Sequence, residues 1–262
     1  MKIEKFKNAV ETFDYERAKL MFNGLEKELK NLLFIDYIIE GKTDYIKFMV
    51  SLGFNVNNEH VKYAARHSRF DLIKYFIENF NINVNYEKGV IISTICNKIF
   101  NKSKSEEHKN TYHFRKHQVE IVKFLIEHGS DIHVFNEEPL SNAIKCNNIE
   151  LVKLLIKNGA DIKFRENNDL ISPLSDTIDN NNFELFEYLI LQGIDINYDD
   201  SYTLKCALFY YSRDKKYSKY VKLLLNNKCI ITNDLSDNYK KYIKELIIES
   251  RNDKLKKING KN

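Results

Sequence analysis

The chain repeats one pattern of apolar and polar positions. Its clearest copy is residues 149–164, IELVKLLIKNGADIKF, in which apolar residues recur at i, i+1, i+4 and i+5. These four positions are Leu151, Val152, Leu155 and Ile156. At 3.6 residues per turn they project to one side of a helix, so the pattern predicts an amphipathic helix. Gly159 follows, and we expect it to end the helix because glycine adopts a positive φ without steric cost.

Two further copies preserve this pattern almost residue for residue. Residues 119–134 lie 30 positions earlier, and the copy that begins at Phe183 lies 34 positions later. Weaker copies occupy residues 45–57, 71–85 and 220–230. The chain therefore repeats a structural unit of about 33 residues, as repeat proteins do.

Two of the weaker copies lack the glycine that should end the helix. Phe80 stands at that position in residues 71–85, and Lys228 stands there in residues 220–230. Asparagine is the next best residue at positive φ. We therefore expect Asn79 and Asn227 to provide the turn in these copies.

A second helix is predicted before each of these helices. The two prolines of the chain, Pro139 and Pro173, are 34 residues apart in EPLSNA and SPLSDT, and proline is tolerated at the first position of a helix. Ala143 and Thr177 are small residues eight positions before Leu151 and Leu185, where two antiparallel helices need to approach closely. Asn147 and Asn181 are then expected in the tight turns between the helices. One such pair cannot cover its own apolar face, but stacked pairs can.

These motifs resemble the ankyrin repeat. The family's T-P-L-H-x-A motif is similar to Glu138-Pro139-Leu140-Ser141 with Ala143 following. Its second motif is similar to Ile149-Glu150-Leu151-Val152 together with Gly159-Ala160-Asp161-Ile162, and Ser172-Pro173-Leu174 and Gly193–Asn197 repeat both. The Thr and His of the first motif are absent, so the hydrogen bonds that they would make between repeats must be replaced or missing.

The resemblance implies an all-α fold, an ankyrin-repeat solenoid of about six stacked helix–turn–helix repeats with helical caps. We place an N-terminal cap at 1–28, the repeats at 29–232 and a C-terminal cap with a basic tail at 233–262. The repeats are expected at 29–57, 58–87, 88–135, 136–165, 166–199 and 200–232. Residues 98–117 are an insert in the third repeat, which we interpret as a surface loop or a helix extension.

Composition excludes several classes of function. The net charge of +4 is small, and only seven of the 41 basic residues are arginine, which argues against a nucleic-acid-binding protein. The basic residues of the tail could form a nucleic-acid or membrane-surface patch, but we interpret them as a solvated tail, since Asp253 interrupts the patch and basic tails commonly serve only solubility. The four widely spaced cysteines fit reduced thiols inside a cell. With no signal peptide or transmembrane segment in the sequence, we expect an intracellular protein, cytoplasmic or nuclear, without membrane contact.

The sequence also offers little for metal or catalytic chemistry. His108, His113 and His117 are the best metal candidates, but no Cys or Glu completes a ligand set, and neighbouring Lys and Arg residues add positive charge. We interpret them as solvent-exposed histidines. No nucleophile, phosphate-loop or zinc-protease motif is present, so we expect no enzyme and no cofactor.

The resemblance implies a non-catalytic scaffold that binds a protein partner on the concave face of the repeat array and is monomeric on its own. The positions that it suggests at first-helix ends are Arg66, His67, Lys145, Cys146, Asp179 and Asn180. The positions in the finger loops between repeats are Phe135, Arg165, Glu166, Asn168, Tyr198 and Asp199. Phe135, Tyr198 and Tyr202 are candidate aromatic anchors in these loops, whereas Phe124, Phe186 and Tyr188 are expected in the core.

An alternative function is a substrate adaptor that recruits cellular machinery such as a ubiquitin ligase. In that case the repeats hold a client, and either residues 98–117 or residues 233–262 recruit the machinery.

Overall fold

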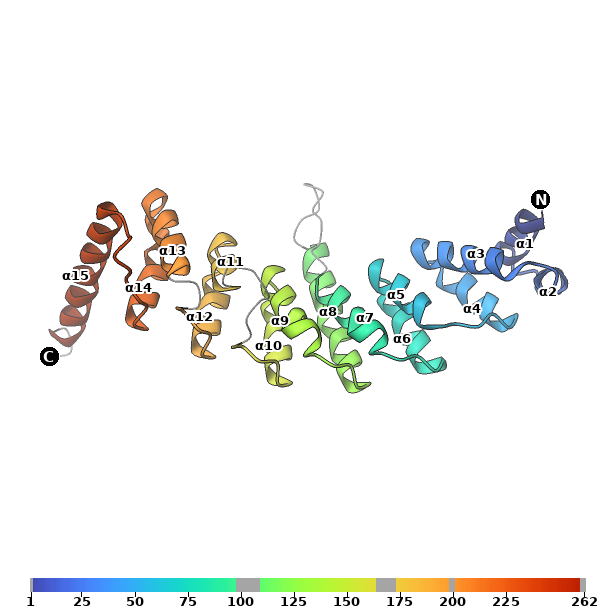
Figure 1. The fold of residues 1–262 in the computed structure, drawn as a ribbon. Coiled ribbons are helices and arrows are strands. Elements are labelled where there is room, and N and C mark those ends of the chain that lie inside the picture. Colours follow the sequence, from blue (N-terminus) through green and yellow to red (C-terminus); the bar gives the residue numbers. More distant parts are fainter. Residues whose placement is uncertain (1, 98–108, 164–172, 198–200, 260–262) are drawn as a thin grey trace. The chain divides into compact units, whose positions relative to one another are not determined.

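Helices are the only regular elements in the part of the chain that the computed structural model describes, residues 2–97, 109–163, 173–197 and 201–259 (Figure 1). The chain divides into two units, residues 1–135 and 136–262. In both units, helices follow one another as antiparallel pairs, and we call the two members of a pair the first and the second helix. The fold is therefore all-α and built of repeated helix pairs, as the sequence pattern predicts.

The first unit holds three pairs after two short N-terminal helices, α1 (Lys2–Glu11) and α2 (Tyr15–Phe22). The pairs are α3 (Lys27–Glu40) with α4 (Thr43–Ser51), α5 (Asn58–Arg66) with α6 (Phe70–Asn79), and α7 (Tyr86–Cys96) with α8 (Lys109–Glu127). First helices pack on first helices, α3 on α5 and α5 on α7, while α6 packs on α8. The first unit thus has a layer of first helices beside a layer of second helices.

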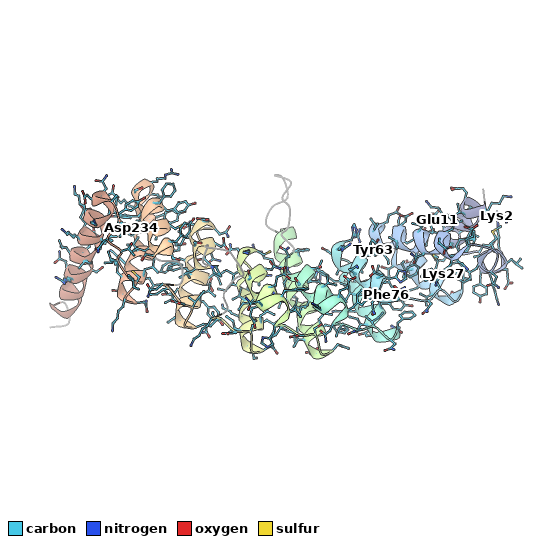
Figure 2. All side chains as sticks on the ribbon, viewed as in Figure 1. Lys2, Glu11, Lys27, Tyr63, Phe76 and Asp234 are labelled. Carbon is cyan, nitrogen blue, oxygen red and sulfur yellow. The ribbon has the colours of Figure 1, made fainter. Side chains whose placement is uncertain are left out.

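The core of the first unit comes from the apolar positions of the repeated pattern. In α6, Leu72, Ile73 and Phe76 are buried, and Figure 2 labels Phe76 among the side chains of the first unit. The ring of Phe76 stacks on that of Phe34 of α3, with ring centroids 6.1 Å apart. Ala64 of α5 is fully buried, which fits the requirement for a small residue where two helices approach closely.

The second unit continues the same arrangement. Its helices are α9 (Val134–Lys145), whose first two residues belong to the first unit, α10 (Ile149–Lys157), α11 (Pro173–Asp179), α12 (Phe183–Leu191), α13 (Tyr202–Arg213), a 3-10 helix at Lys215–Tyr217, α14 (Ser218–Asn226) and α15 (Asp237–Asn259). First helix α11 packs on α13, second helix α12 packs on α14, and α15 covers α14. The boundaries of the individual repeats remain a prediction.

The second helices of this unit bury three of the four predicted apolar positions. Leu151, Val152 and Leu155 of α10 are completely buried, whereas Ile156 is partly exposed. The fourth position therefore lies at the edge of the buried stripe rather than within it.

Pairs of asparagines build the turns between helices in the second unit. Asn147 and Asn181 have φ angles of 57° and 50°, as predicted for the tight turn. The following residues, Asn148 and Asn182, cap the second helices by accepting the N–H groups of residues 151 and 185. Asn182 Nδ2 also donates to Asn147 Oδ1 at 2.6 Å, so the turns of successive pairs are hydrogen-bonded without the Thr and His of the family motif.

The ends of the second helices confirm that glycine ends the helix at positive φ. They also show that asparagine does not provide the turn where this glycine is missing. Gly159 has a φ of 101°, but at the equivalent position in the last pair Lys228 itself adopts a φ of 61°, while Asn227 stays at −95°. The N–H groups of Lys228 and Cys229 bond back to the last turn of α14 just as those of Gly159 and Ala160 bond to α10. These hydrogen bonds determine which position adopts a positive φ angle, whichever residue type occupies it.

The prediction for Asn79 is also wrong. Asn79 remains inside α6, and Phe80 follows in extended conformation with φ −135° and ψ 158°. Because Phe80 leaves the helix directly into an extended segment, this helix end needs no residue at positive φ.

Left-handed turns precede two of the first helices. Residues 135–137 have φ angles of 50°, 58° and 64°, so the right-handed part of α9 begins after them and Pro139 lies in its first turn. Residues 87–89 form the equivalent turn in α7. There, a Cβ on Gly89 would lie 2.5 Å from Val134 Cγ1, so glycine is required by both the φ angle and the close packing.

The insert is in part a helix extension. Residues 109–117 form the beginning of α8, while residues 98–108, including His108, lie outside the described residues. Gln118 Nε2 donates to the carbonyl oxygen of Ile95 at 2.6 Å and joins α8 to the last turn of α7. In the residues that the structure describes, no helix is long and apolar enough to cross a membrane.

Candidate partner-binding surface

Three of the predicted binding residues are exposed in the first unit. Arg66 ends α5, and His67 follows it at the C-cap. Phe135 lies in the left-handed turn 135–137, and half of its side chain is exposed. An aromatic ring held outward by a tight turn is suited to contact a partner.

The other described candidates lie at first-helix ends in the second unit. Lys145, Asp179 and Asn180 are exposed at the ends of α9 and α11, whereas Cys146 is buried. The remaining predicted positions lie outside the described residues: Arg165, Glu166, Asn168, Tyr198 and Asp199.

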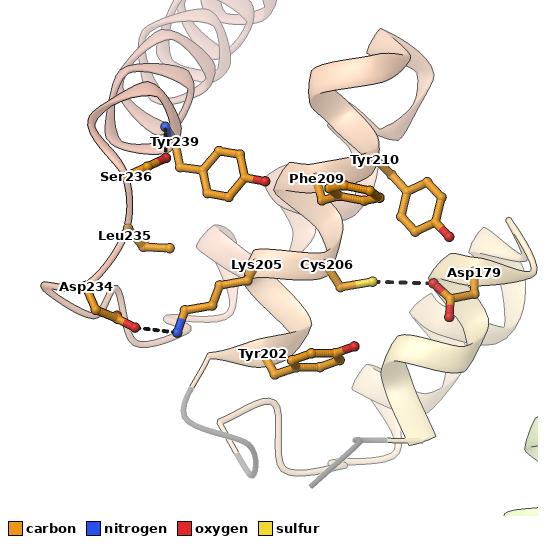
Figure 3. A pocket seen from close by; sticks show the side chains of 10 residues that line it. All are labelled: Asp179, Tyr202, Lys205, Cys206, Phe209, Tyr210, Asp234, Leu235, Ser236 and Tyr239. Atoms are coloured by element: carbon orange, nitrogen blue, oxygen red, sulfur yellow. Dashed lines mark hydrogen bonds and ion pairs between the residues drawn. The ribbon is translucent and has the colours of Figure 1, made fainter.

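A groove of about 610 Å³ opens in the second unit beside α13 (Figure 3). The end of α11 forms one side, α13 forms the floor, and the segment that leads into α15 forms the other side. Its lining residues are Asp179, Tyr202, Lys205, Cys206, Phe209, Tyr210, Asp234, Leu235, Ser236 and Tyr239. Of the predicted residues of this unit that the structure describes, Asp179 and the candidate anchor Tyr202 line the groove.

An ion pair holds one side of the groove together. Lys205 Nζ lies 2.6 Å from Asp234 Oδ2, and this hydrogen bond lowers the pKa of Asp234. The Asp234 side chain is 62% exposed, so the pair contributes little to stability. Its effect is to place the segment before α15 against α13 and to neutralise both charges.

The opposite side of the groove carries Asp179. Cys206 Sγ lies 3.5 Å from Asp179 Oδ1, and Figure 3 shows both groups facing each other. Burial raises the pKa of Tyr210, and the nearby Asp179 carboxylate raises it further. A carboxylate, a thiol and a phenol therefore meet at this end.

Aromatic rings line the space between these two sides. Tyr202 and Phe209 lie on the same face of α13 at i and i+7, and these residues are 44% and 40% exposed. Tyr202 was expected in a finger loop, but it is the first residue of α13. The spacing of seven residues was the sequence signal for this exposed face. Core residues of a helix have the same spacing, so the spacing alone does not distinguish an exposed face from a buried one.

Two other aromatic predictions need correction. Phe186 is buried as expected, but Phe124 and Tyr188 are only partly buried. Phe124 lies 4.0 Å from the ring of His128, and Lys153 Nζ lies 5.6 Å from the centre of the Tyr188 ring. Both rings therefore cover the outer surface of second helices, where aliphatic and cationic groups shield them.

The groove offers ring faces, one ion pair, and a carboxylate beside a thiol and a phenol. In the described ranges, no group of three or more His, Cys, Asp and Glu residues could hold a metal ion. The side chains of His108 and His113 are not among those described.

Comparisons with known proteins agree with this architecture. Residues 112–200, which contain most of α8 and all of α9 to α12, match the family model described as ankyrin repeats in three copies. A protein of Acanthamoeba polyphaga mimivirus that is named as an ankyrin repeat protein is 27% identical over 106 residues. The matched segment covers 39% of this chain but only 14% of the relative's length.

Ankyrin repeats are in general non-enzymatic modules for protein–protein interaction. The family match over residues 112–200 and the helix pairs, with their asparagine turns and glycine ends, lead to the same conclusion: this segment of the chain is similar to ankyrin repeats.

Proposed function

We propose that this chain is a non-catalytic scaffold that binds a protein partner on the face formed by its first helices and finger loops. The observation that carries the proposal is the groove beside α13, because a first helix forms its floor and it presents exposed aromatic rings. Both Tyr202 and Phe209 are exposed at this groove.

The chemistry of the groove suits a protein anchor. Tyr202 and Phe209 are fixed on a helix, so little conformational entropy is lost when a partner covers them. Aromatic residues of this kind dominate the binding energy of many interfaces. Lys205 and Asp234 form a polar rim on one side, which limits where a partner's apolar group can settle.

The same proposal includes the predicted positions outside the groove. Phe135, Arg66 and His67 would provide contacts in the first unit, and Lys145 and Asn180 in the second. The finger positions between residues 165 and 168, and at residues 198 and 199, belong to the proposal through the family resemblance alone.

The adaptor alternative gains no specific support. It requires a segment that recruits machinery, and the first candidate, residues 98–117, is described only from residue 109 onward. The other candidate contains α15, whose Leu246 and Ile243 are buried, as in a helix that covers the last repeat.

The double variant Tyr202→Ser/Phe209→Ser should lose partner binding. A single aromatic anchor of an interface contributes about 2 kcal/mol or more, so the loss of even one of the two should lower the affinity by about 30-fold, and the double variant should lose at least that much. The measurement is affinity capture from extracts of the cells that make the protein, followed by titration of the captured partner against both forms.

Leu191→Ser is the matched control. Leu191 is 76% exposed on second helix α12, so this change also removes an exposed apolar side chain from the second unit but should leave capture intact. Circular dichroism must show equal helicity for all three proteins. If the double variant captures the partner as well as the wild type, the first-helix face is not the binding surface.

A further inference from the structure

We propose that a pocket lined by α1 and by the end of α2 holds the C-terminal residue of a polypeptide that ends in leucine or a similar aliphatic residue. The aliphatic side chain enters the pocket, and the free carboxylate binds the ammonium groups of Lys2 and Lys5. This pocket lies in the first unit, whereas the groove beside α13 lies in the second, so the two sites can be tested independently.

The size of the pocket is the first reason. It has a volume of about 220 Å³, and its lining consists of Lys2, Lys5, Met21, Gly24 and Leu25. At about 30 Å³ for a group the size of a water molecule, it has room for roughly seven such groups. A leucine side chain together with its carboxylate has roughly as many heavy atoms, whereas a long acyl chain has many more. The volume therefore fits one terminal residue rather than a lipid.

The apolar part of the lining is the second reason. It comes from the side chains of Met21, which is partly exposed, and Leu25, which is buried. Methionine is flexible and adapts to the shape of what it contacts. A Cβ placed on Gly24 would meet only the carbonyl oxygen of Met21, at 3.7 Å, so the backbone there leaves open space beside it. An aliphatic side chain can be removed from water in such a pocket.

The charge of the lining is the third reason. Lys2 and Lys5 stand at i and i+3 on α1, so they lie on the same face of the helix. Within the described ranges, neither ammonium group makes a hydrogen bond or an ion pair. Glu4, the acidic residue of the same helical turn, does not line the pocket. Two cations beside an apolar space complement a ligand that is aliphatic at one end and carries a carboxylate at the other.

The walls of the pocket are fixed by contacts outside its lining. Helix α1 packs on α2, and the ring centroids of Phe6 and Phe22 lie 6.0 Å apart between them. Lys30 Nζ donates to the carbonyl oxygen of Phe22 at 2.9 Å and joins the end of α2 to α3. Because these contacts hold the pocket open without a ligand, little conformational entropy is lost when a ligand binds.

The test is an NMR titration of the full chain, labelled with ¹³C in its methionine methyl groups, with N-acetyl-leucine. This probe carries the side chain and the free carboxylate of a C-terminal leucine. The chain has three methionines, of which Met21 lines the pocket and Met49 is completely buried in α4. We expect a saturable shift of the Met21 signal and none of the Met49 signal. The absence of a saturable Met21 shift would overturn the proposal.

Two double variants test the role of the lysines. Lys2→Gln/Lys5→Gln removes both charges from the lining and should bind N-acetyl-leucine at least about tenfold more weakly, because hydrogen bonds to a charged group are lost. Lys19→Gln/Lys47→Gln removes the same charge from two exposed lysines of the first unit that do not line the pocket, and it should bind the probe like the wild type. Circular dichroism must show equal helicity for all three proteins.

Three comparison probes test which parts of the ligand are recognised. N-acetyl-leucine methylamide lacks the carboxylate and N-acetylglycine lacks the aliphatic side chain, so each should bind at least about tenfold more weakly than N-acetyl-leucine. Dodecanoate distinguishes a lipid from a terminal residue and should not bind more tightly than N-acetyl-leucine. The proposal is wrong if the methylamide or N-acetylglycine binds as well as N-acetyl-leucine, if dodecanoate binds more tightly, or if Lys2→Gln/Lys5→Gln binds like the wild type.

Discussion

Leu155→Ala will lower the free energy of unfolding by about 2–5 kcal/mol. Leu155 is completely buried in α10, within the stripe that it shares with Leu151 and Val152. Removing most of its side chain takes apolar surface out of the core and leaves a cavity that neighbouring helices cannot fully close. Urea denaturation followed by circular dichroism measures the change.

The matched change Leu191→Ala tests whether burial is the cause. Leu191 belongs to second helix α12 of the same unit, but it is 76% exposed, so its truncation should alter stability by less than about 0.5 kcal/mol. Equal effects at the two positions would show that Leu155 does not lie in the buried stripe.

Acidification from pH 7.5 to pH 4 will cost the first unit about 3 kcal/mol through His60. Burial lowers the pKa of His60 to about 4, and the nearby Glu59 carboxylate offsets only part of this effect. The Nδ1 atom of His60 accepts the N–H of Asn57 at 3.0 Å, and Nε2 lies 2.8 Å from Asn31 Oδ1. Protonation would remove the acceptor and place a charge beside buried rings.

Stability falls on acidification because the unfolded chain binds the proton at His60 more readily than the folded chain does. Below about pH 6.5 the histidine of the unfolded chain is protonated, whereas the folded chain keeps it neutral until about pH 4. The folded state therefore loses stability as the pH falls through this window and loses no more below it. At pH 7.5 the contribution is fully present.

His60→Gln should flatten this pH dependence, because glutamine has no proton to gain in this range. The exposed His128 provides the matched variant, and His128→Gln should retain the wild-type profile. Chemical denaturation at a series of pH values gives the free energies. A wild-type profile for His60→Gln would mean that another group causes the loss.

Local signals predicted much of the fold from the sequence. Asn147 and Gly159 occupy positions where the backbone needs a positive φ, and the residue types that tolerate this conformation are few. The apolar stripe that includes Leu151 follows directly from the helical period. Lys228 shows the limit of this reasoning, because hydrogen bonds to the preceding turn impose a positive φ on a residue that does not favour it.

The groove could not be predicted in the same way. Its lining comes from three places, around Asp179, along α13 and after Asp234, and no period in the sequence connects them. The exposure of Tyr202 and Phe209 depends on how far α11 and the segment before α15 extend over α13. Asp179 was predicted only because it stands at a first-helix end, where the family's contacts gather.

Photocrosslinking tests most directly whether partners bind on the first-helix face. A benzoylphenylalanine residue is introduced at Phe209 of α13 in one protein and at Leu191 of α12 in another, and each is irradiated in extracts of the cells that make the protein. Both positions are exposed and belong to the same unit. The account predicts a discrete protein adduct at position 209 and none at position 191, and the reverse pattern would contradict it.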